Sequence, residues 1–201
     1  MPRRPQPGAR DQILDAAGAL FYTRGVRAVG MSEVVEAAGC GKNLVYTHFP
    51  AKVDLVAAYL ERFRSWRERA ADEAVAGAAD PAARILALTA EVARRAAAPD
   101  SRGCALRNYL TEFPDSDDAA SRVAHDYLRD SRARLAALVD RLETADAAAV
   151  TDRIWLVLEG LYAVGTRRGV AGVGGTAVDL VKEIIERATP DFPPTQGSGQ
   201  S

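Results

Sequence analysis

Residues 39–52 read GCGKNLVYTHFPAK, and this stretch decides the fold. It predicts a short helix over residues 42–49, because glycines precede that segment and Pro50 cannot continue it. Val45 and Phe49 are one helical turn apart and are expected to face the protein interior. The opposite side then carries side chains that can donate hydrogen bonds to phosphates or base edges, namely Lys42, Asn43, Tyr46 and Thr47.

Two more helices are predicted before this one. Ile13, Ala17 and Phe21 recur at helical spacing ahead of Gly25, which is placed to end a first helix. A short second helix is expected to begin with Ser32 as its N-cap and to end at the glycine at position 39. Two short helices joined by a tight glycine turn and braced by a longer one form a helix-turn-helix, whose second helix fits the major groove of DNA.

The whole chain is predicted to be all-α, with about nine helices. Its 201 residues are 48% hydrophobic and only 6% aromatic, a composition that favours helices over sheets. Proline interrupts a helix interior, and the long spans without proline are 8–49, 51–80, 82–98 and 115–189.

A long fourth helix and five others are predicted after the three helices of the helix-turn-helix. Their expected ranges are about 52–79, 81–98, 103–113, 118–142, 145–168 and 177–188. Asp80 with Pro81 is expected to cap the fifth helix, and Ser116 or Asp117 the seventh. Residues 1–8 are predicted to be a disordered basic arm, and residues 190–201 a disordered tail.

Other classes of protein are disfavoured. No stretch approaches the roughly 18 consecutive apolar residues that a membrane span needs, and the N-terminus lacks an apolar signal segment. We therefore expect a soluble, cytoplasmic protein.

The two cysteines, Cys40 and Cys104, lack metal-ligand spacing and are too few for a disulfide framework. Each is therefore expected to be a buried or half-buried apolar residue. No cofactor or metal is predicted.

Charge divides the chain into a basic front and an acidic body. Residues 1–69 contain 11 Lys and Arg against 7 Asp and Glu, a net of +4, whereas residues 70–201 contain 15 against 20, a net of −5. A phosphate-binding module attached to a regulatory body would show this asymmetry, and solvated helix faces could also produce it.

The N-terminal quarter of the chain resembles the TetR family of bacterial transcriptional repressors. The matching residues run from ILDAAGALFYTRGVRAVGMSEVVEAAGC through GKNLVYTHFPAKVDL. The most discriminating positions are Tyr46, His48, Phe49, Lys52 and Leu55. The resemblance implies a helix-turn-helix DNA-binding domain over residues 9–52 and a ligand-binding and dimerisation domain over residues 53–189.

The resemblance also implies roles for single residues. Tyr46, His48 and Lys52 would contact phosphates of double-stranded DNA. Bases or adjacent phosphates would be met by Lys42, Asn43, Leu44 and Thr47, and Ser32 is a further candidate for DNA contact.

Three positions depart from the family pattern. Gly41 replaces the usual serine cap of the recognition helix, which removes a side-chain contact. Leu44 replaces a small hydroxyl residue, so a contact with a thymine methyl group becomes possible there. Val35 replaces a small alanine between the two short helices.

A small-molecule site is expected among apolar walls of the C-terminal helices. The candidates are Trp66, Cys104, Asn108, Tyr109, Glu112, Phe113, His125, Tyr127, Trp155 and Tyr162. Aromatic residues at helical spacing are more often plain core. Asn108 and Glu112 form a polar pair one turn apart on a face that should be buried, and their partner is either a ligand or an internal hydrogen bond.

The last two helices carry apolar surfaces too broad for one buried side, which favours a two-fold homodimer through a four-helix interface. The predicted function is a ligand-responsive regulator, a repressor that binds a palindromic operator as a dimer and is released by a small molecule. The alternative is a helix-turn-helix regulator whose C-terminal domain binds a protein partner or no ligand.

An enzyme is disfavoured. His125 is the one histidine base outside the DNA-binding domain, and no nucleophile motif, phosphate loop or metal spacing occurs.

Overall fold

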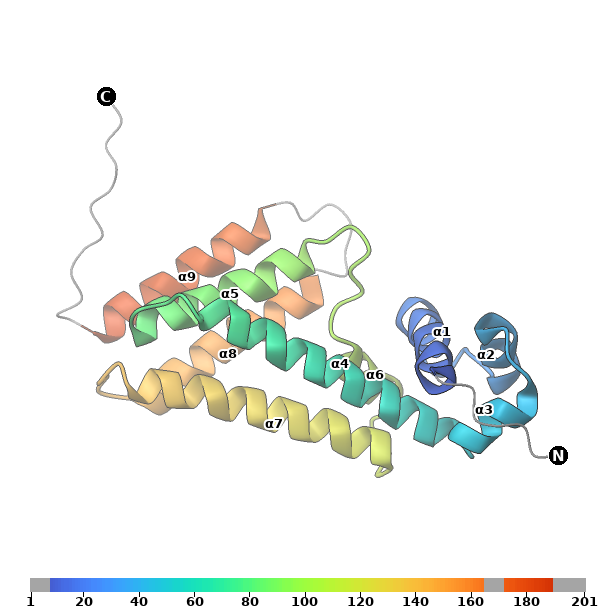
Figure 1. Ribbon diagram of the computed structural model, residues 1–201. Coiled ribbons are helices and arrows are strands. Elements are labelled where there is room, and N and C mark those ends of the chain that lie inside the picture. The colour runs from blue at the N-terminus through green and yellow to red at the C-terminus, as the bar shows by residue number, and fades with distance from the viewer. Residues whose placement is uncertain (1–7, 165–171, 190–201) are drawn as a thin grey trace. The chain divides into compact units, whose positions relative to one another are not determined.

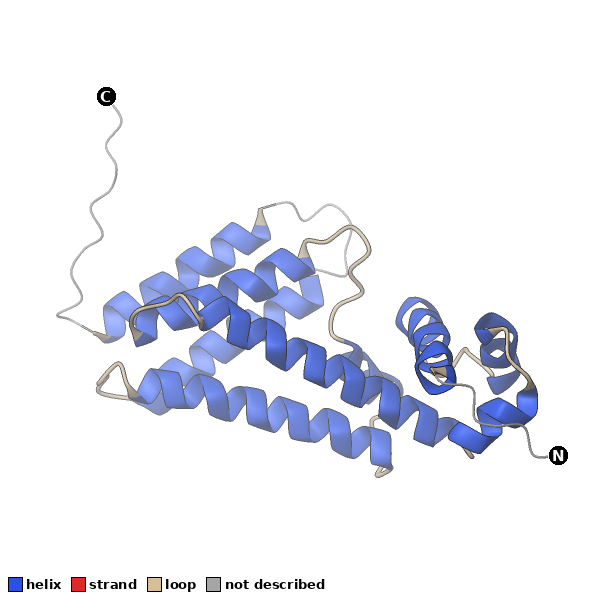
Figure 2. Ribbon diagram, in the orientation of Figure 1, coloured by secondary structure: helices blue, strands red, loops and turns tan. Residues whose placement is uncertain are grey.

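Nine helices and no strands make up residues 8–164 and 172–189, which are the residues that the computed structural model describes (Figure 1, Figure 2). The helices are α1 (Ala9–Arg24), α2 (Met31–Ala38), α3 (Lys42–His48), α4 (Lys52–Val75), α5 (Pro81–Ala96), α6 (Ala105–Glu112), α7 (Ala119–Asp140), α8 (Ala147–Val164) and α9 (Val173–Ala188). The predicted all-α fold of about nine helices is confirmed. Residues 1–7 of the predicted arm, the predicted tail and residues 165–168 of the predicted eighth helix lie outside the described residues, whereas Gly8 is the N-cap of α1.

The chain divides into two compact units. We call Met1–Asp72 with Asp100–Ser131 the head unit, and Glu73–Pro99 with Arg132–Ser201 the bundle unit. Both α4 and α7 contribute residues to each unit. In the described part of the chain, no helix is both long and apolar enough to cross a bilayer.

Glycines end the first two helices as the sequence predicted. Gly25 has φ 85° and donates its N–H to the carbonyl of Phe21 at 3.0 Å, and Gly39 has φ 60° and donates to Glu36 at 3.0 Å. These left-handed conformations suit glycine because it has no Cβ.

The cap of α2 differs from the prediction. Gly30, two residues before Ser32, is the N-cap, because the Glu33 carboxylate reaches back and accepts the Gly30 N–H at 2.8 Å. Ser32 is an exposed residue within the first turn. The predicted cap of α5 is confirmed, since the Asp80 carboxylate accepts the N–H of Ala83 at 2.8 Å.

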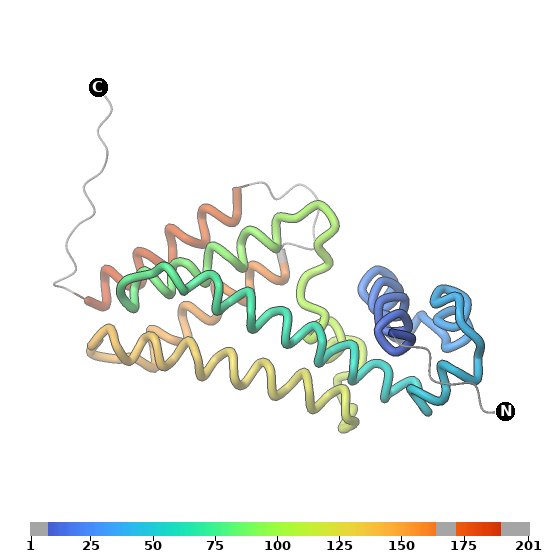
Figure 3. The backbone as a smooth tube through the Cα atoms, viewed as in Figure 1, coloured from blue at the N-terminus to red at the C-terminus, as the bar shows by residue number. Residues whose placement is uncertain are grey.

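The core of the bundle unit is formed by α5, α8 and α9, with the C-terminal part of α7 against them. Figure 3 follows α5 and α9, which lie side by side. Ile85, Ile154, Val181 and Ile185 are fully buried at their meeting point. Burial of such side chains contributes about 1.5–3 kcal/mol each, which holds these helices together.

Asp118 caps α7 in the head unit, where the sequence predicted Ser116 or Asp117. Its carboxylate accepts the N–H of Ser121 and the hydroxyls of Tyr109 and Ser116, each at 2.7 Å. Burial acts to raise the pKa of this carboxyl group, but the hydrogen bonds from Ser121, Ser116 and Tyr109 outweigh burial and lower the pKa to about 2. The cap is Asp118 because its carboxylate reaches the amides of the first turn, while Ser116 serves as a donor to it.

The lowered pKa predicts how the stability of the head depends on pH. A carboxyl group with a folded pKa below its unfolded value of about 3.9 stabilises the fold above that value, and this contribution is lost as pH falls through the folded pKa. Asp118→Asn should therefore lower the free energy of unfolding at neutral pH, and its difference from the unmodified protein should narrow as the pH falls from about 5 to about 2. Urea denaturation followed by circular dichroism measures both. Asp117→Asn is the control, because the Asp117 carboxylate is exposed; equal pH profiles for the two variants would contradict the assignment.

Candidate nucleic-acid interface

Helix α3 rests on α1 and α2 through one apolar side. Val45 and Phe49 are buried, as the sequence predicted, together with Val34 and Ala38 of α2. The guanidinium of Arg10 covers the outer face of the Phe49 ring, 5.3 Å from its centroid. These contacts fix which side of α3 faces away from the protein.

The opposite side of α3 is a row of exposed polar side chains. Lys42, Asn43, Tyr46 and Thr47 are all exposed, with Tyr46 at 39%. The Lys42 ammonium lies 5.7 Å from the centroid of the Tyr46 ring, and the Thr47 hydroxyl donates to the Asn43 carbonyl at 2.7 Å. Helix α3 contains no acidic residue. A cation, an amide and two hydroxyls on one short helix are suited to phosphates and base edges.

Two other predicted DNA residues on α3 are less open. Leu44 is half-buried, and so is His48, whose Nε2 atom is buried and has no hydrogen-bond partner. That nitrogen faces the protein, so a phosphate would reach the other edge of the ring. The role of His48 stays a prediction.

Lys52 lies in the first turn of α4, and its ammonium is engaged within the head. It donates to the Val26 carbonyl at 2.7 Å. Burial lowers the pKa of Lys52, and the nearby carboxylates of Glu112 and Glu33 counteract that shift. A phosphate that binds here would share or replace the Val26 carbonyl as the acceptor.

The connector between α1 and α2 is held by the last turn of α6. The Glu112 carboxylate accepts the N–H of Val26 at 3.2 Å and that of Arg27 at 2.7 Å. The Arg27 guanidinium donates in return to the Glu112 carbonyl and lies 4.8 Å from the centroid of the Phe113 ring. We call these contacts the connector clasp. A Cβ at Gly25 would lie 2.8 Å from the Glu112 Oε1 atom, so glycine is required for this close approach.

The predicted ligand residues on α6 have internal partners. The Asn108 amide donates to the Arg102 carbonyl at 2.7 Å, and Glu112 takes part in the connector clasp. Of the two alternatives for this polar pair, an internal hydrogen bond is present at both positions. Tyr109 is buried, donates to Asp118 and stacks on Phe113 with centroids 4.8 Å apart. The other residue of this group, Cys104, is buried directly before α6.

The remaining ligand candidates are dispersed. In the head unit Trp66 is 41% exposed, His125 is exposed and Tyr127 is buried. In the bundle unit Trp155 and Tyr162 are half-buried against the apolar core. Contact of any of them with a ligand stays a prediction.

Sequence reasoning missed Arg27 and Tyr22. The Tyr22 hydroxyl accepts the Arg102 N–H at 2.9 Å, and no local pattern indicates such distant partners.

Sequence comparison relates this interface to known regulators. The family model described as bacterial regulatory proteins, tetR family, matches residues 13–59. The HTH-type transcriptional repressor BdcR of Escherichia coli (strain K12) is 28% identical over 200 residues, which cover 92% of this chain and 95% of BdcR. Other curated relatives match at 37–42% identity, and the chain spans between 25% and 39% of their lengths.

Structural comparison extends the similarity over nearly the whole chain. A transcriptional regulator of the tetR type (sav143) from Streptomyces avermitilis MA-4680 is 30% identical, with a TM-score of 0.78 and coverage of 90% of this chain and 97% of that one. SCO4454, a TetR-family transcriptional regulator from Streptomyces coelicolor, is 22% identical, with a TM-score of 0.86 and coverage of 92% and 97%. A transcriptional regulator from Saccharomonospora viridis in complex with choline is 20% identical, with a TM-score of 0.74 and coverage of 90% and 97%.

The connector clasp predicts that a change of Glu112 reduces the protection of the connector amides from hydrogen exchange. Glu112→Ala removes a charged acceptor from two backbone amides, so the free energy of unfolding should fall by about 1–3 kcal/mol. Amide hydrogen exchange at Val26 and Arg27 should accelerate. Thr111→Ala is the matched control, because the Thr111 hydroxyl donates only to Arg107 of its own helix, at 3.0 Å. Unchanged exchange in Glu112→Ala would show that the clasp does not hold the connector.

Proposed function

This chain belongs to the TetR family of bacterial regulatory proteins, which are DNA-binding transcriptional regulators and not enzymes, and we propose that it is a repressor that binds a palindromic operator as a homodimer and is released by a small molecule. The observation that carries the proposal is the outward side of α3, where Lys42, Asn43, Tyr46 and Thr47 are exposed above a buried apolar side. Such a helix can enter the major groove without disturbing its own packing.

The residues of the head divide into two roles in this proposal. Tyr46, His48 and Lys52 position the protein on the phosphate backbone, which gives affinity for every duplex. Lys42, Asn43, Leu44 and Thr47 approach base edges and select the sequence, and Ser32 contributes from the first turn of α2. The same reasoning places the protein in the bacterial cytoplasm, where its DNA lies.

A homodimer through α8 and α9 supplies the two-fold symmetry of the operator. Leu156 of α8 is 69% exposed and Leu180 of α9 is 44% exposed. Large aliphatic side chains that are exposed to water on both helices support the proposal that an apolar surface of a second copy covers them. Two heads related by two-fold symmetry would place their α3 helices about 34 Å apart, one turn of DNA.

Release by a small molecule follows from differential binding to two conformations. A ligand that favours a spacing of the heads unsuited to DNA lowers operator affinity by the ratio of its affinities for the two states. The similarity to the repressor BdcR supports repression, and the similarity to a choline-bound regulator supports a small-molecule ligand. The alternative is a regulator whose C-terminal domain binds a protein partner or no ligand. The internal hydrogen bonds of Asn108 and Glu112 favour that alternative at those two positions.

A genomic footprint followed by a release assay tests the proposal as a whole. Footprinting should return two-fold symmetric sites, and small-molecule screening by thermal shift should find ligands that raise the melting temperature and release the recovered DNA. Recovery of sites without any stabilising ligand would favour the alternative. Failure to bind any duplex at low salt would contradict DNA recognition by α3.

Substitutions on the head should separate the two roles. Lys52→Ala should weaken binding to all duplexes and reduce the slope of log K against log salt by about 0.9, the value for one phosphate contact, and Tyr46→Ala should weaken all duplexes similarly. Asn43→Ala should cost about 1–3 kcal/mol at one base-pair position and relax the sequence preference there. Fluorescence anisotropy with matched and scrambled duplexes measures these effects. The roles would be wrongly assigned if Tyr46→Ala altered only the sequence preference.

Charge substitutions should test the dimer. Leu156→Glu and Leu180→Glu would each bury a carboxylate in an apolar interface, at a cost of several kcal/mol, and should shift the protein toward monomer in sedimentation velocity. Arg141→Glu is the control, because Arg141 is exposed and lies outside α8 and α9. A dimer that persists in both leucine variants would place the interface elsewhere.

A further inference from the structure

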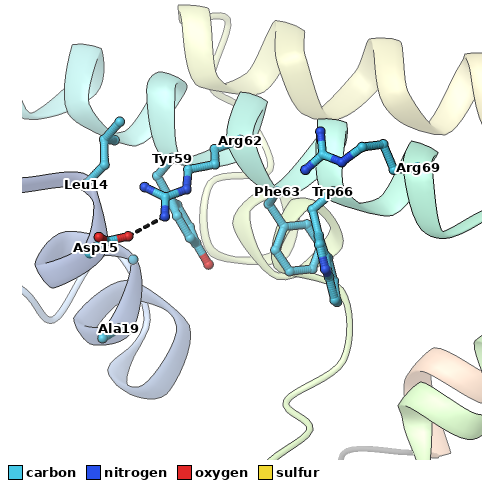
Figure 4. Close-up of a pocket in the computed structure, with 9 residues that line it drawn as sticks. Leu14, Asp15, Ala19, Tyr59, Arg62, Phe63, Trp66 and Arg69 are labelled. Atoms are coloured by element: carbon cyan, nitrogen blue, oxygen red, sulfur yellow. Dashed lines mark hydrogen bonds and ion pairs between the residues drawn. The ribbon is translucent and has the colours of Figure 1, made fainter. Parts of the chain in front are cut away.

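A groove in the head unit lies between α1 and α4, and no residue of α3 lines it (Figure 4). Its volume is about 420 Å³. Binding sites for small molecules typically have volumes of roughly 300–1,000 Å³ and apolar walls with a few polar groups. Leu14 and Ala19 of α1 form one wall, and Tyr59, Phe63 and Trp66 of α4 form the other.

The wall formed by α4 presents an aromatic surface to solvent. The Trp66 ring is 41% exposed and lies against the Phe63 ring, with centroids 5.3 Å apart and an interplanar angle of 57°. Phe63 also stacks on Tyr22 of α1, with centroids 6.3 Å apart, so its position is fixed on two sides. An exposed indole beside a fixed aromatic ring is suited to stack a planar apolar group.

The polar groups of the groove are two guanidinium groups and one carboxylate. Arg62 of α4 forms an ion pair with Asp15 of α1. Arg69 lines the same groove and forms no hydrogen bond or ion pair with any described residue. The lining therefore has a net charge of +1, and its unpaired cation is Arg69. Arg69 is seven positions after Arg62, roughly 10 Å along the helix at 1.5 Å per residue. In Figure 4 the Arg69 side chain runs back along α4 toward Arg62.

We propose that this groove binds a planar aromatic carboxylate. The ring of the ligand stacks on the Trp66 indole and contacts the tilted Phe63 ring, and its carboxylate accepts hydrogen bonds from the Arg69 guanidinium. The fork of the guanidinium group matches a carboxylate in geometry as well as in charge. A neutral aromatic molecule would leave Arg69 without an anion, and a small inorganic anion would leave the aromatic wall in water. The ligand class that satisfies both features combines a ring with an acid.

Nuclear magnetic resonance of the tryptophan side chains tests the site without DNA, so the result does not depend on the proposed operator binding. The chain has two tryptophans, and Trp155→Phe assigns the indole N–H signal of Trp66. The probes are 2-naphthoate, its neutral counterpart 2-naphthylmethanol, and inorganic phosphate. We expect 2-naphthoate to shift the Trp66 signal, and 2-naphthylmethanol and phosphate to bind at least about tenfold more weakly, a difference of about 1.4 kcal/mol.

Variants of the exposed lining identify the contacts. Arg69→Gln should raise the dissociation constant of 2-naphthoate about fivefold to tenfold, and Trp66→Leu should raise it by a similar factor. Arg141→Gln, an exposed arginine of the bundle unit, should leave it unchanged. Melting temperatures equal to that of the unmodified protein show that the variants fold. The proposal is overturned if 2-naphthylmethanol binds as tightly as 2-naphthoate, if phosphate alone shifts the Trp66 signal equally, or if Arg69→Gln and Arg141→Gln behave alike.

Discussion

Burial of Val45 and Phe49 is the constraint on which the rest of the head depends. Helix α3 has seven residues, and a helix of that length is not stable alone in water because nucleation costs more than its few hydrogen bonds return. Packing against α1 and α2 supplies the missing stability. Since both apolar residues occupy one side, the polar residues are left on the other. The surface offered to DNA is therefore a direct result of the packing.

Helix positions could be predicted from the sequence because glycine and proline mark them. Gly25 and Gly39 end helices in left-handed conformations, and Pro81 begins α5. The predicted caps of α2 and α7 were wrong by one or two residues, since a cap depends on which side chain reaches the free amides. At α2 the Glu33 carboxylate accepts the Gly30 N–H, which makes Gly30 the N-cap. Hydrophobic spacing does not contain this information.

The function of polar residues in the C-terminal part could be predicted only as a set of alternatives. The sequence indicated that Asn108 and Glu112 need partners, and the structure supplies both from within the protein. The partners of Glu112 are 85 and 86 residues away along the chain, and no local periodicity reports a contact over that separation. The α1–α4 groove was missed for the same reason, although Arg62, Trp66 and Arg69 already share a helical face.

Gly25 and Gly39 both have a positive φ but differ in ψ, which is 154° at Gly25 and 25° at Gly39, and in their surroundings. At Gly39 a side chain would enter open space, whereas at Gly25 it would meet the Glu112 carboxylate. Asparagine and aspartate tolerate left-handed backbone, so a random mutagenesis library selected for folded protein should recover them at position 39. Position 25 should return glycine alone. A shorter residue at position 112 would remove this contact but not the strain of a positive φ, so relatives should keep glycine at position 25.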